Sequence, residues 1–208
     1  GDVYATGVRQ DFDGMKFNLC TEGRSVPAEL PVPGLHMVRN ALLAVAAGRA
    51  FGLALNECAE GLRKLQLTKG RLEQKLVRGL QILDDTYNAN PDSMSAALRT
   101  LAQMPAAGRR IAVLGRMGEL GRETERGHRQ VGEVAAELGI DCVIGVGDEP
   151  GWIAEAASRG GVRDVLKLGT TEEAVHTLRE LARPGDVVLV KGSRSARMER
   201  VVEGLQTP

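Results

Sequence analysis

Carboxylate and amide side chains are concentrated in one stretch, residues 84–91, which directly follows an apolar run. Two adjacent carboxylates, Asp84 and Asp85, are costly at the end of a buried strand unless they are solvated or paired. Asn90 can cap a following helix, and the free N–H groups of that helix's first turn would favour an anion beside the carboxylates. Acids, amides and proline are also ordinary turn and cap formers, so composition alone favours a structural role for this stretch.

A second polar stretch, residues 191–195, follows another apolar run and brings two cations, Lys191 and Arg194, to its end. Gly192 permits a close approach to the backbone, and this combination suits a carboxylate or a phosphate group. A solvated basic loop is the simpler explanation when the stretch is taken alone.

Other candidate sites have less support. The glycine-rich residues 115–121 match neither Gly-x-x-x-x-Gly-Lys-[Ser/Thr] nor Gly-x-Gly-x-x-Gly, so we predict no nucleotide-phosphate role for them. No phosphate-loop pattern of the first kind occurs anywhere in the sequence. Among the histidines, His36 is a site candidate at a helix start, His128 is expected to be structural or exposed, and His176 is expected to be inert.

Composition excludes several classes of partner. The chain has 27 Lys plus Arg and 27 Asp plus Glu residues, so its formal net charge is zero. It therefore has no overall positive potential that would attract nucleic acid or an anionic membrane surface. No apolar run approaches the roughly 20 residues of a membrane span, and no signal peptide is visible, so membrane insertion is not expected. Cys20, Cys58 and Cys142 form no CxxC pair, which indicates no metal site and predicts a reducing, cytoplasmic location.

Hydrophobic periodicity predicts the elements that position these residues. Residues 1–30 are typical of short strands, with Asp13-Gly14 as a hairpin turn, and two helices follow. Gly52 is expected to end the first helix, and Asn56 is expected to cap the second. The expected elements are strands at 3–9 and 15–21, and helices at 36–50 and from 56 to about 65.

Beyond a linker at residues 68–70, the pattern changes to a hairpin around Arg78-Gly79 and then to alternating apolar strands and helices. Thr170 and Glu173 predict a capping box. This alternation predicts an α/β fold with a Rossmann-like, mostly parallel sheet, whose ligands gather at the carboxyl ends of the strands. The expected strands are 80–83, 111–114, 142–146, 165–168 and 187–190, and the expected helices are 92–104, 127–138, 150–158, 171–182 and 197–205.

Four segments, in matching order and spacing, are similar to signatures of the Mur ligase family, and the agreement extends over nearly the whole chain. Any one of them is only moderately specific, whereas four in order are a specific signal. The residue sequence Tyr87-Asn88-Ala89-Asn90 resembles that of the family members that add D-alanyl-D-alanine more than that of the other Mur ligases or of folylpolyglutamate synthase. The segments are residues 33–41 (PGLHMVRNA), 70–73 (GRLE), 83–94 (LDDTYNANPDSM) and 190–199 (VKGSRSARME).

The resemblance implies that the chain is the C-terminal part of a larger ligase. Residues 1–68 would be the end of a central ATPase domain, and residues 69–208 would be the C-terminal domain. Such an enzyme uses ATP and Mg²⁺ to add D-alanyl-D-alanine to UDP-N-acetylmuramoyl-tripeptide, through an acyl phosphate, in peptidoglycan precursor synthesis. ATP and Mg²⁺ would be held mainly by the part of the central domain that carries the phosphate loop. The 208-residue chain alone is therefore expected to be inactive, and the enzyme is expected to be a monomer.

The resemblance also implies roles for individual residues. Arg71 is the expected catalytic residue, because its fork of donors suits the terminal phosphates of ATP. No metal ligand is expected within the chain. The expected ATP-binding residues are His36, Asn40, Arg71, Asp85, Tyr87 and Asn88. The expected residues for the peptide or dipeptide are Asn88, Asn90, Ser93, Lys191, Ser193 and Arg194.

Two positions depart from the family pattern. Met37 stands where the family often has asparagine, and Arg116 stands in Gly-Arg-Met where the family usually has Gly-Asp-Met. The exchange at Arg116 reverses a charge at a strand end, which removes any acidic role there. Two alternatives stay open at this point: a fragment of another Mur-type ligase, and a non-catalytic Rossmann-like binding module.

Overall fold

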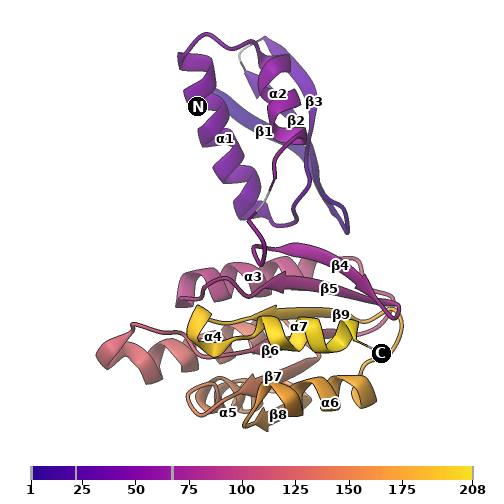
Figure 1. The fold of residues 1–208 in the computed structure, drawn as a ribbon. Helices are drawn as coiled ribbons and strands as arrows, with labels where there is room; N and C mark the ends of the chain where they lie inside the picture. Colours follow the sequence, from indigo (N-terminus) through magenta and orange to yellow (C-terminus); the bar gives the residue numbers. More distant parts are fainter. Residues whose placement is uncertain (1, 22, 67, 208) are drawn as a thin grey trace. The chain divides into compact units, whose positions relative to one another are not determined.

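The computed structural model describes residues 2–21, 23–66 and 68–207. Its contacts divide the chain into two compact units, Gly1–Thr68 and Lys69–Pro208 (Figure 1). Each unit has its own sheet and its own buried core. In the described part of the chain, no helix is long and apolar enough to cross a membrane.

Unit 1 is a three-stranded antiparallel sheet with strand order β1-β2-β3, packed against two helices. The central strand buries alternate residues, including Met15, Phe17 and Leu19, which is the period-two pattern of a half-buried strand. The elements are β1 (Val3–Asp11), β2 (Gly14–Thr21), β3 (Arg24–Leu30), α1 (Leu35–Ala50) and α2 (Leu55–Arg63).

Two details of unit 1 correct the sequence predictions. The first hairpin turns at residues 12–13, one residue earlier than expected, and Gly14 opens β2 with a φ of 137°. A Cβ at Gly14 would collide with the carbonyl oxygen of Leu30, so glycine is required there. The cap of α2 is Ala54 rather than Asn56, because the Glu57 carboxylate accepts the Ala54 N–H at 2.7 Å.

Unit 2 confirms the predicted α/β fold. Its six-stranded sheet has the order β4-β5-β9-β6-β7-β8, and every neighbouring pair is parallel except β4 with β5. Its strands are β4 (Glu73–Val77), β5 (Leu80–Asp85), β6 (Arg110–Leu114), β7 (Cys142–Val146), β8 (Asp164–Leu168) and β9 (Val187–Lys191). Its helices are α3 (Pro91–Gln103), η1 (Gly121–Glu123), α4 (Thr124–Glu137), α5 (Gly151–Arg159), α6 (Thr171–Leu181), η2 (Arg194–Ala196) and α7 (Glu199–Gln206).

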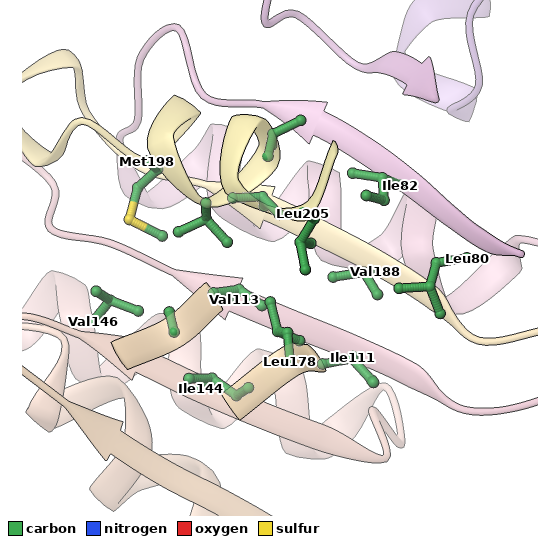
Figure 2. Packing of buried hydrophobic residues seen from close by; sticks show 14 of the residues in the cluster. Leu80, Ile82, Ile111, Val113, Ile144, Val146, Leu178, Val188, Met198 and Leu205 are labelled. Atoms are coloured by element: carbon green, nitrogen blue, oxygen red, sulfur yellow. The ribbon is translucent and has the colours of Figure 1, made fainter. Parts of the chain in front are cut away.

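The four inner strands of unit 2, β5, β9, β6 and β7, are largely buried on both faces, which explains their apolar runs. On one face, Ile82, Val188 and Ile144 pack with Leu178 of α6 and Leu205 of α7 (Figure 2). Helix α3 contacts β9 and β6, and it packs on α4, which packs in turn on α5 over the opposite face. The sheet is therefore the middle of three layers.

Two helix starts in unit 2 were predicted from cap residues. Asn90 caps α3 as expected, since its side chain accepts the Ser93 N–H at 2.8 Å. Thr170 likewise accepts the Glu173 N–H at 3.1 Å. The second half of the predicted capping box is wrong by one residue, because the Glu173 carboxylate accepts the N–H of Gly169 at 2.8 Å.

Candidate functional site

Three strands of unit 2 end side by side at one edge of the sheet. Lys191, the last residue of β9, lies in register with Asp85 of β5 on one side and Leu114 of β6 on the other. Strand β9 lies between β5 and β6 in the sheet. Helix α7, which follows β9, covers one face, whereas α3 and α4, which follow β5 and β6, pack together over the other face. Such a switch point is where open α/β sheets bind ligands.

Lys191 is held inside this edge. Its Nζ lies 2.6 Å from Asp85 Oδ2 and donates to the Asn88 carbonyl at 2.9 Å. The side chains of Lys191 and Asp85 are only 3% and 14% exposed. The predicted cation of the last strand is therefore already neutralised by one of the two predicted carboxylates.

The other carboxylate is paired as well. Asp84 is buried, its Oδ2 lies 2.5 Å from Lys75 Nζ, and its Oδ1 accepts the Thr86 hydroxyl at 2.7 Å. Burial by itself lowers the pKa of Lys75, but the hydrogen bond and charge of Asp84, with the charge of Glu73, raise that pKa above its usual value. The pair of carboxylates is thus a structural feature of the strand end, satisfied from β4 and β9.

The segment before β4 is fastened to the same strand end. The Tyr87 N–H donates to the Gly70 carbonyl at 2.9 Å, and the Leu72 N–H donates to Asp85 Oδ1 at 3.1 Å. Between these two ties, the Arg71 guanidinium carbon lies 4.2 Å from the centre of the Tyr87 ring. Arg71 and Tyr87 are exposed, so they are available to a ligand at this edge.

The polar residues after β5 form hydrogen bonds with nearby backbone groups; they are Asn88, Asn90 and Ser93. Asn90 and Ser93 form a reciprocal cap, in which Ser93 Oγ also accepts the Asn90 N–H at 3.0 Å. Asn88 is exposed, and its carbonyl receives Lys191. The Asn90 side chain therefore occupies one of the helix N–H groups that the sequence left free for an anion.

The loop after β9 packs closely on the loop after β6. Gly115 N–H donates to the Lys191 carbonyl at 2.8 Å, and a Cβ on either Gly115 or Gly192 would press into Met198. The close approach expected at Gly192 is thus made by protein rather than by a ligand. Ser193 is buried and lies 3.1 Å from the Ser195 hydroxyl, whereas Arg194 is exposed.

The loop after β6 is joined to the loop after β7 by an ion pair. Arg116, which departs from the family pattern, forms an ion pair with Glu149 after β7 at 3.3 Å. The reversed charge therefore bridges two strand-end loops.

His128 is a structural residue. Its side chain is buried, its Nε2 accepts the Met117 N–H at 3.1 Å, and its Nδ1 lies 2.6 Å from the Thr124 carbonyl. This pattern fits a neutral ring that donates from Nδ1. Burial lowers the pKa of His128, although the Thr124 carbonyl opposes the shift.

The buried ring predicts a pH-dependent loss of stability. Below about pH 6.5 the unfolded chain takes up a proton that the folded ring resists, so the free energy of unfolding falls as pH falls, by at most about 1.4 kcal/mol per unit. Urea unfolding between pH 8 and 5 should show this slope in the wild-type chain and a smaller slope in His128→Gln. His176→Gln, whose ring is 76% exposed, should keep the wild-type slope; equal slopes in all three proteins would contradict the assignment.

The predicted residues of unit 1 lie on α1. His36 and Asn40 are one helical turn apart, so their side chains share one face of the helix. Asn40 is exposed, and its Nδ2 lies 4.0 Å from the sulfur of Met37, the other departure from the family pattern. The thioether thus stands where a polar contact was expected.

Sequence reasoning missed Lys75 and the Leu72 N–H. Both complete the strand-end network by binding Asp84 and Asp85. The available signal was the alternation of Glu73 and Lys75 on a strand that pairs antiparallel with β5. Within the described ranges, no three His, Cys, Asp or Glu side chains are grouped to hold a metal ion.

Comparison with known proteins places this geometry in a family. Residues 70–194 match the family model of the Mur ligase, glutamate ligase domain, which spans the strand ends described above. The chain belongs to the Mur ligase family. Its matched region begins at Gly70 and ends at Arg194, so it contains the Arg71 segment, the β5 end and the β9 loop.

Relatives of this Mur ligase chain carry more specific names. One relative is the UDP-N-acetylmuramoyl-tripeptide--D-alanyl-D-alanine ligase of Escherichia coli K12. The two sequences are 41% identical in an alignment that covers 99% of this chain and 44% of the relative. The ligase of the same name from Bacillus subtilis 168 is 35% identical over 98% of the chain and 46% of the relative. The crystal structure of MurF from Acinetobacter baumannii matches with a TM-score of 0.85 and 34% identity, covering 99% of this chain and 45% of that one. The chain therefore spans less than half the length of these relatives.

Proposed function

We propose that this chain is part of an ATP-dependent amide ligase that adds D-alanyl-D-alanine to UDP-N-acetylmuramoyl-tripeptide in peptidoglycan precursor synthesis. The observation that carries the proposal is the 41% identity, over 99% of the chain, to a ligase of that name. The exposed Arg71 at the strand-end edge gives the proposal a chemical basis, because a guanidinium suits phosphate oxygens. Since ATP is the proposed co-substrate, we place the reaction in the cytoplasm.

The proposed reaction has two steps. A carboxylate oxygen of the tripeptide attacks the γ-phosphorus of ATP, which forms an acyl phosphate and releases ADP. The amine of D-alanyl-D-alanine then attacks the acyl carbon and loses a proton, and inorganic phosphate leaves with the carboxylate oxygen that carried it. The products are the amide, ADP and phosphate, and no external oxidant or reductant is needed.

Mg²⁺ would offset the charge of the nucleotide phosphates when it is bound. The residues that the structure describes do not group three ligands of the usual kinds, so we assign no metal site and no step through Mg²⁺ to this chain. We propose that ATP and Mg²⁺ are held mainly by residues of the parent enzyme beyond these 208.

Within this chain, we propose that Arg71 contacts the ATP phosphates and is the catalytic residue. Asp85 and Lys191 are proposed to support the site as a pair, because each is largely buried against the other. The remaining proposed contacts divide by substrate. ATP would be contacted by His36, Asn40, Tyr87 and Asn88, and the peptide or dipeptide would be contacted by Asn88, Asn90, Ser93, Ser193 and Arg194.

The proposal predicts activity in the full-length parent and none in the 208-residue chain. Phosphoryl transfer depends on positioning and charge around the phosphates, and the sequence contains no phosphate-loop pattern to supply them. Each protein would be incubated with ATP, Mg²⁺ and the UDP-linked tripeptide, and phosphate release would be measured with D-alanyl-D-alanine, a diamino acid or D-glutamate. Release by the parent should require D-alanyl-D-alanine.

A different amine preference in the same assay would favour another Mur-type ligase. Absence of turnover with every amine, together with no phosphate-loop pattern upstream of Gly1 in the gene, would favour a binding module. Turnover by the 208-residue chain alone would contradict the proposed division of the site.

A further inference from the structure

The backbone on both sides of Arg71 is tied to the end of β5. The Gly70 carbonyl accepts the Tyr87 N–H, and the Leu72 N–H donates to Asp85. Gly70 has a φ of 71°, and a Cβ there would lie 3.0 Å from the Thr86 hydroxyl oxygen, so the turn into Arg71 is fixed and close-packed. These two hydrogen bonds keep the Arg71 backbone with the sheet of unit 2.

Because the Arg71 backbone is held in place, the orientation of its side chain depends on the groups that contact the guanidinium. Its guanidinium carbon lies 4.2 Å from the centre of the Tyr87 ring, within the range of a cation–π contact. Within the part of the chain that the structure describes, Arg71 forms no ion pair. The ring face is therefore the contact that orients it.

The nearby carboxylates are occupied by other cations. Asp84 is paired with Lys75, and Asp85 is paired with Lys191 and the Leu72 N–H. A carboxylate partner would neutralise Arg71 and use its donors, whereas a ring face leaves the charge and the in-plane N–H groups available. The two lysine pairs therefore keep the arginine unneutralised at this edge.

We propose that Tyr87 is a positioning residue for Arg71, and that its ring holds the guanidinium ready for phosphate oxygens. This inference rests on the proposed ligase function, in which Arg71 contacts the ATP phosphates. It replaces a direct nucleotide contact of Tyr87 with an action through Arg71. A cation–π contact at an exposed site biases a side chain by roughly two- to fivefold, and misplacement of a catalytic group can cost on the order of a hundredfold in rate.

The test is a double-mutant cycle in the full-length parent, with kcat and the KM for ATP measured for each variant. Tyr87→Leu should lower kcat by about tenfold, and Tyr87→Phe should recover most of that loss because it keeps the ring face. In an Arg71→Lys background, Tyr87→Leu should lower kcat by less than about twofold further, because the residue acts through the guanidinium. An undiminished loss in that background, or a Tyr87→Phe as poor as Tyr87→Leu, would overturn the proposal.

A second readout separates this inference from the proposed function. In the 208-residue chain, NMR should show an upfield ring-current shift of the Arg71 δ-methylene protons that Tyr87→Phe keeps and Tyr87→Leu abolishes. An unshifted wild-type signal would overturn the positioning role even if the parent ligates. A parent that does not ligate would overturn the proposed function while the shift remains.

Discussion

Arg71→Lys in the full-length parent enzyme should lower kcat by on the order of a thousandfold with ATP saturating. Lysine keeps the positive charge but loses the planar fork that can bind two phosphate oxygens at once. The structure shows an exposed guanidinium whose backbone is tied on both sides and which rests on Tyr87, so a lysine would also lose much of its orientation. The measurement is steady-state phosphate release with all substrates saturating.

The matched control is Arg126→Lys on α4. Arg126 is 83% exposed and pairs with Glu123 one turn away, so its exchange should leave kcat within about twofold and change stability by less than about 1 kcal/mol. If Arg71→Lys behaves like this control, Arg71 is a surface residue and the proposed catalytic role is wrong.

Lys191→Met should destabilise the 208-residue chain by about 3 kcal/mol. The substitution removes the cation that sits 2.6 Å from Asp85 and leaves that largely buried carboxylate without its ion-pair partner. It also removes the bond from Lys191 to the Asn88 carbonyl. Thermal unfolding should move down by roughly 6 to 12 °C for a chain of this size.

Two controls separate a structural amine from a free ligand-binding amine. Lys167→Met breaks an exposed pair with Glu155, in which Lys167 is 52% exposed, and should cost less than about 1 kcal/mol. Asp85→Asn combined with Lys191→Met should recover part of the lost stability, because the unpaired charge is gone. Unchanged stability in Lys191→Met would show that the amine is available to ligands instead.

The strand and helix alternation of unit 2 was predictable because parallel strands are buried on both faces and read as short apolar runs. Strand β9, for example, is four apolar residues that end in the cation Lys191, and Gly192 follows at once. Cap chemistry was predictable at Asn90 for a similar reason, since the cap is local and depends on residues only three apart.

The pairing of the candidate residues was not predictable, because it depends on strand order. Asp85 and Lys191 are 106 residues apart, and they meet only because β9 inserts between β5 and β6. Periodicity within each strand carries no information on that order. The two charged stretches therefore had open roles from sequence alone. In the structure Asp85 of one stretch binds Lys191 of the other, Asp84 binds Lys75, and Arg71 is exposed.

The domain assignment is a separate case. The division of contacts at Thr68 and Lys69 is a property of this chain, whereas the assignment of residues 1–68 to a central ATPase domain stays a proposal. That assignment depends on residues beyond the present sequence.

The transfer of oxygen from the peptide carboxylate to phosphate tests the central claim most directly. The full-length parent would be given UDP-linked tripeptide labelled with ¹⁸O in its terminal carboxylate, together with ATP, Mg²⁺ and D-alanyl-D-alanine. Mass spectrometry of the products should find one ¹⁸O atom in inorganic phosphate and the other in the new amide, because the acyl phosphate releases the oxygen that attacked ATP. Unlabelled phosphate, or label in AMP, would contradict an acyl-phosphate ligase.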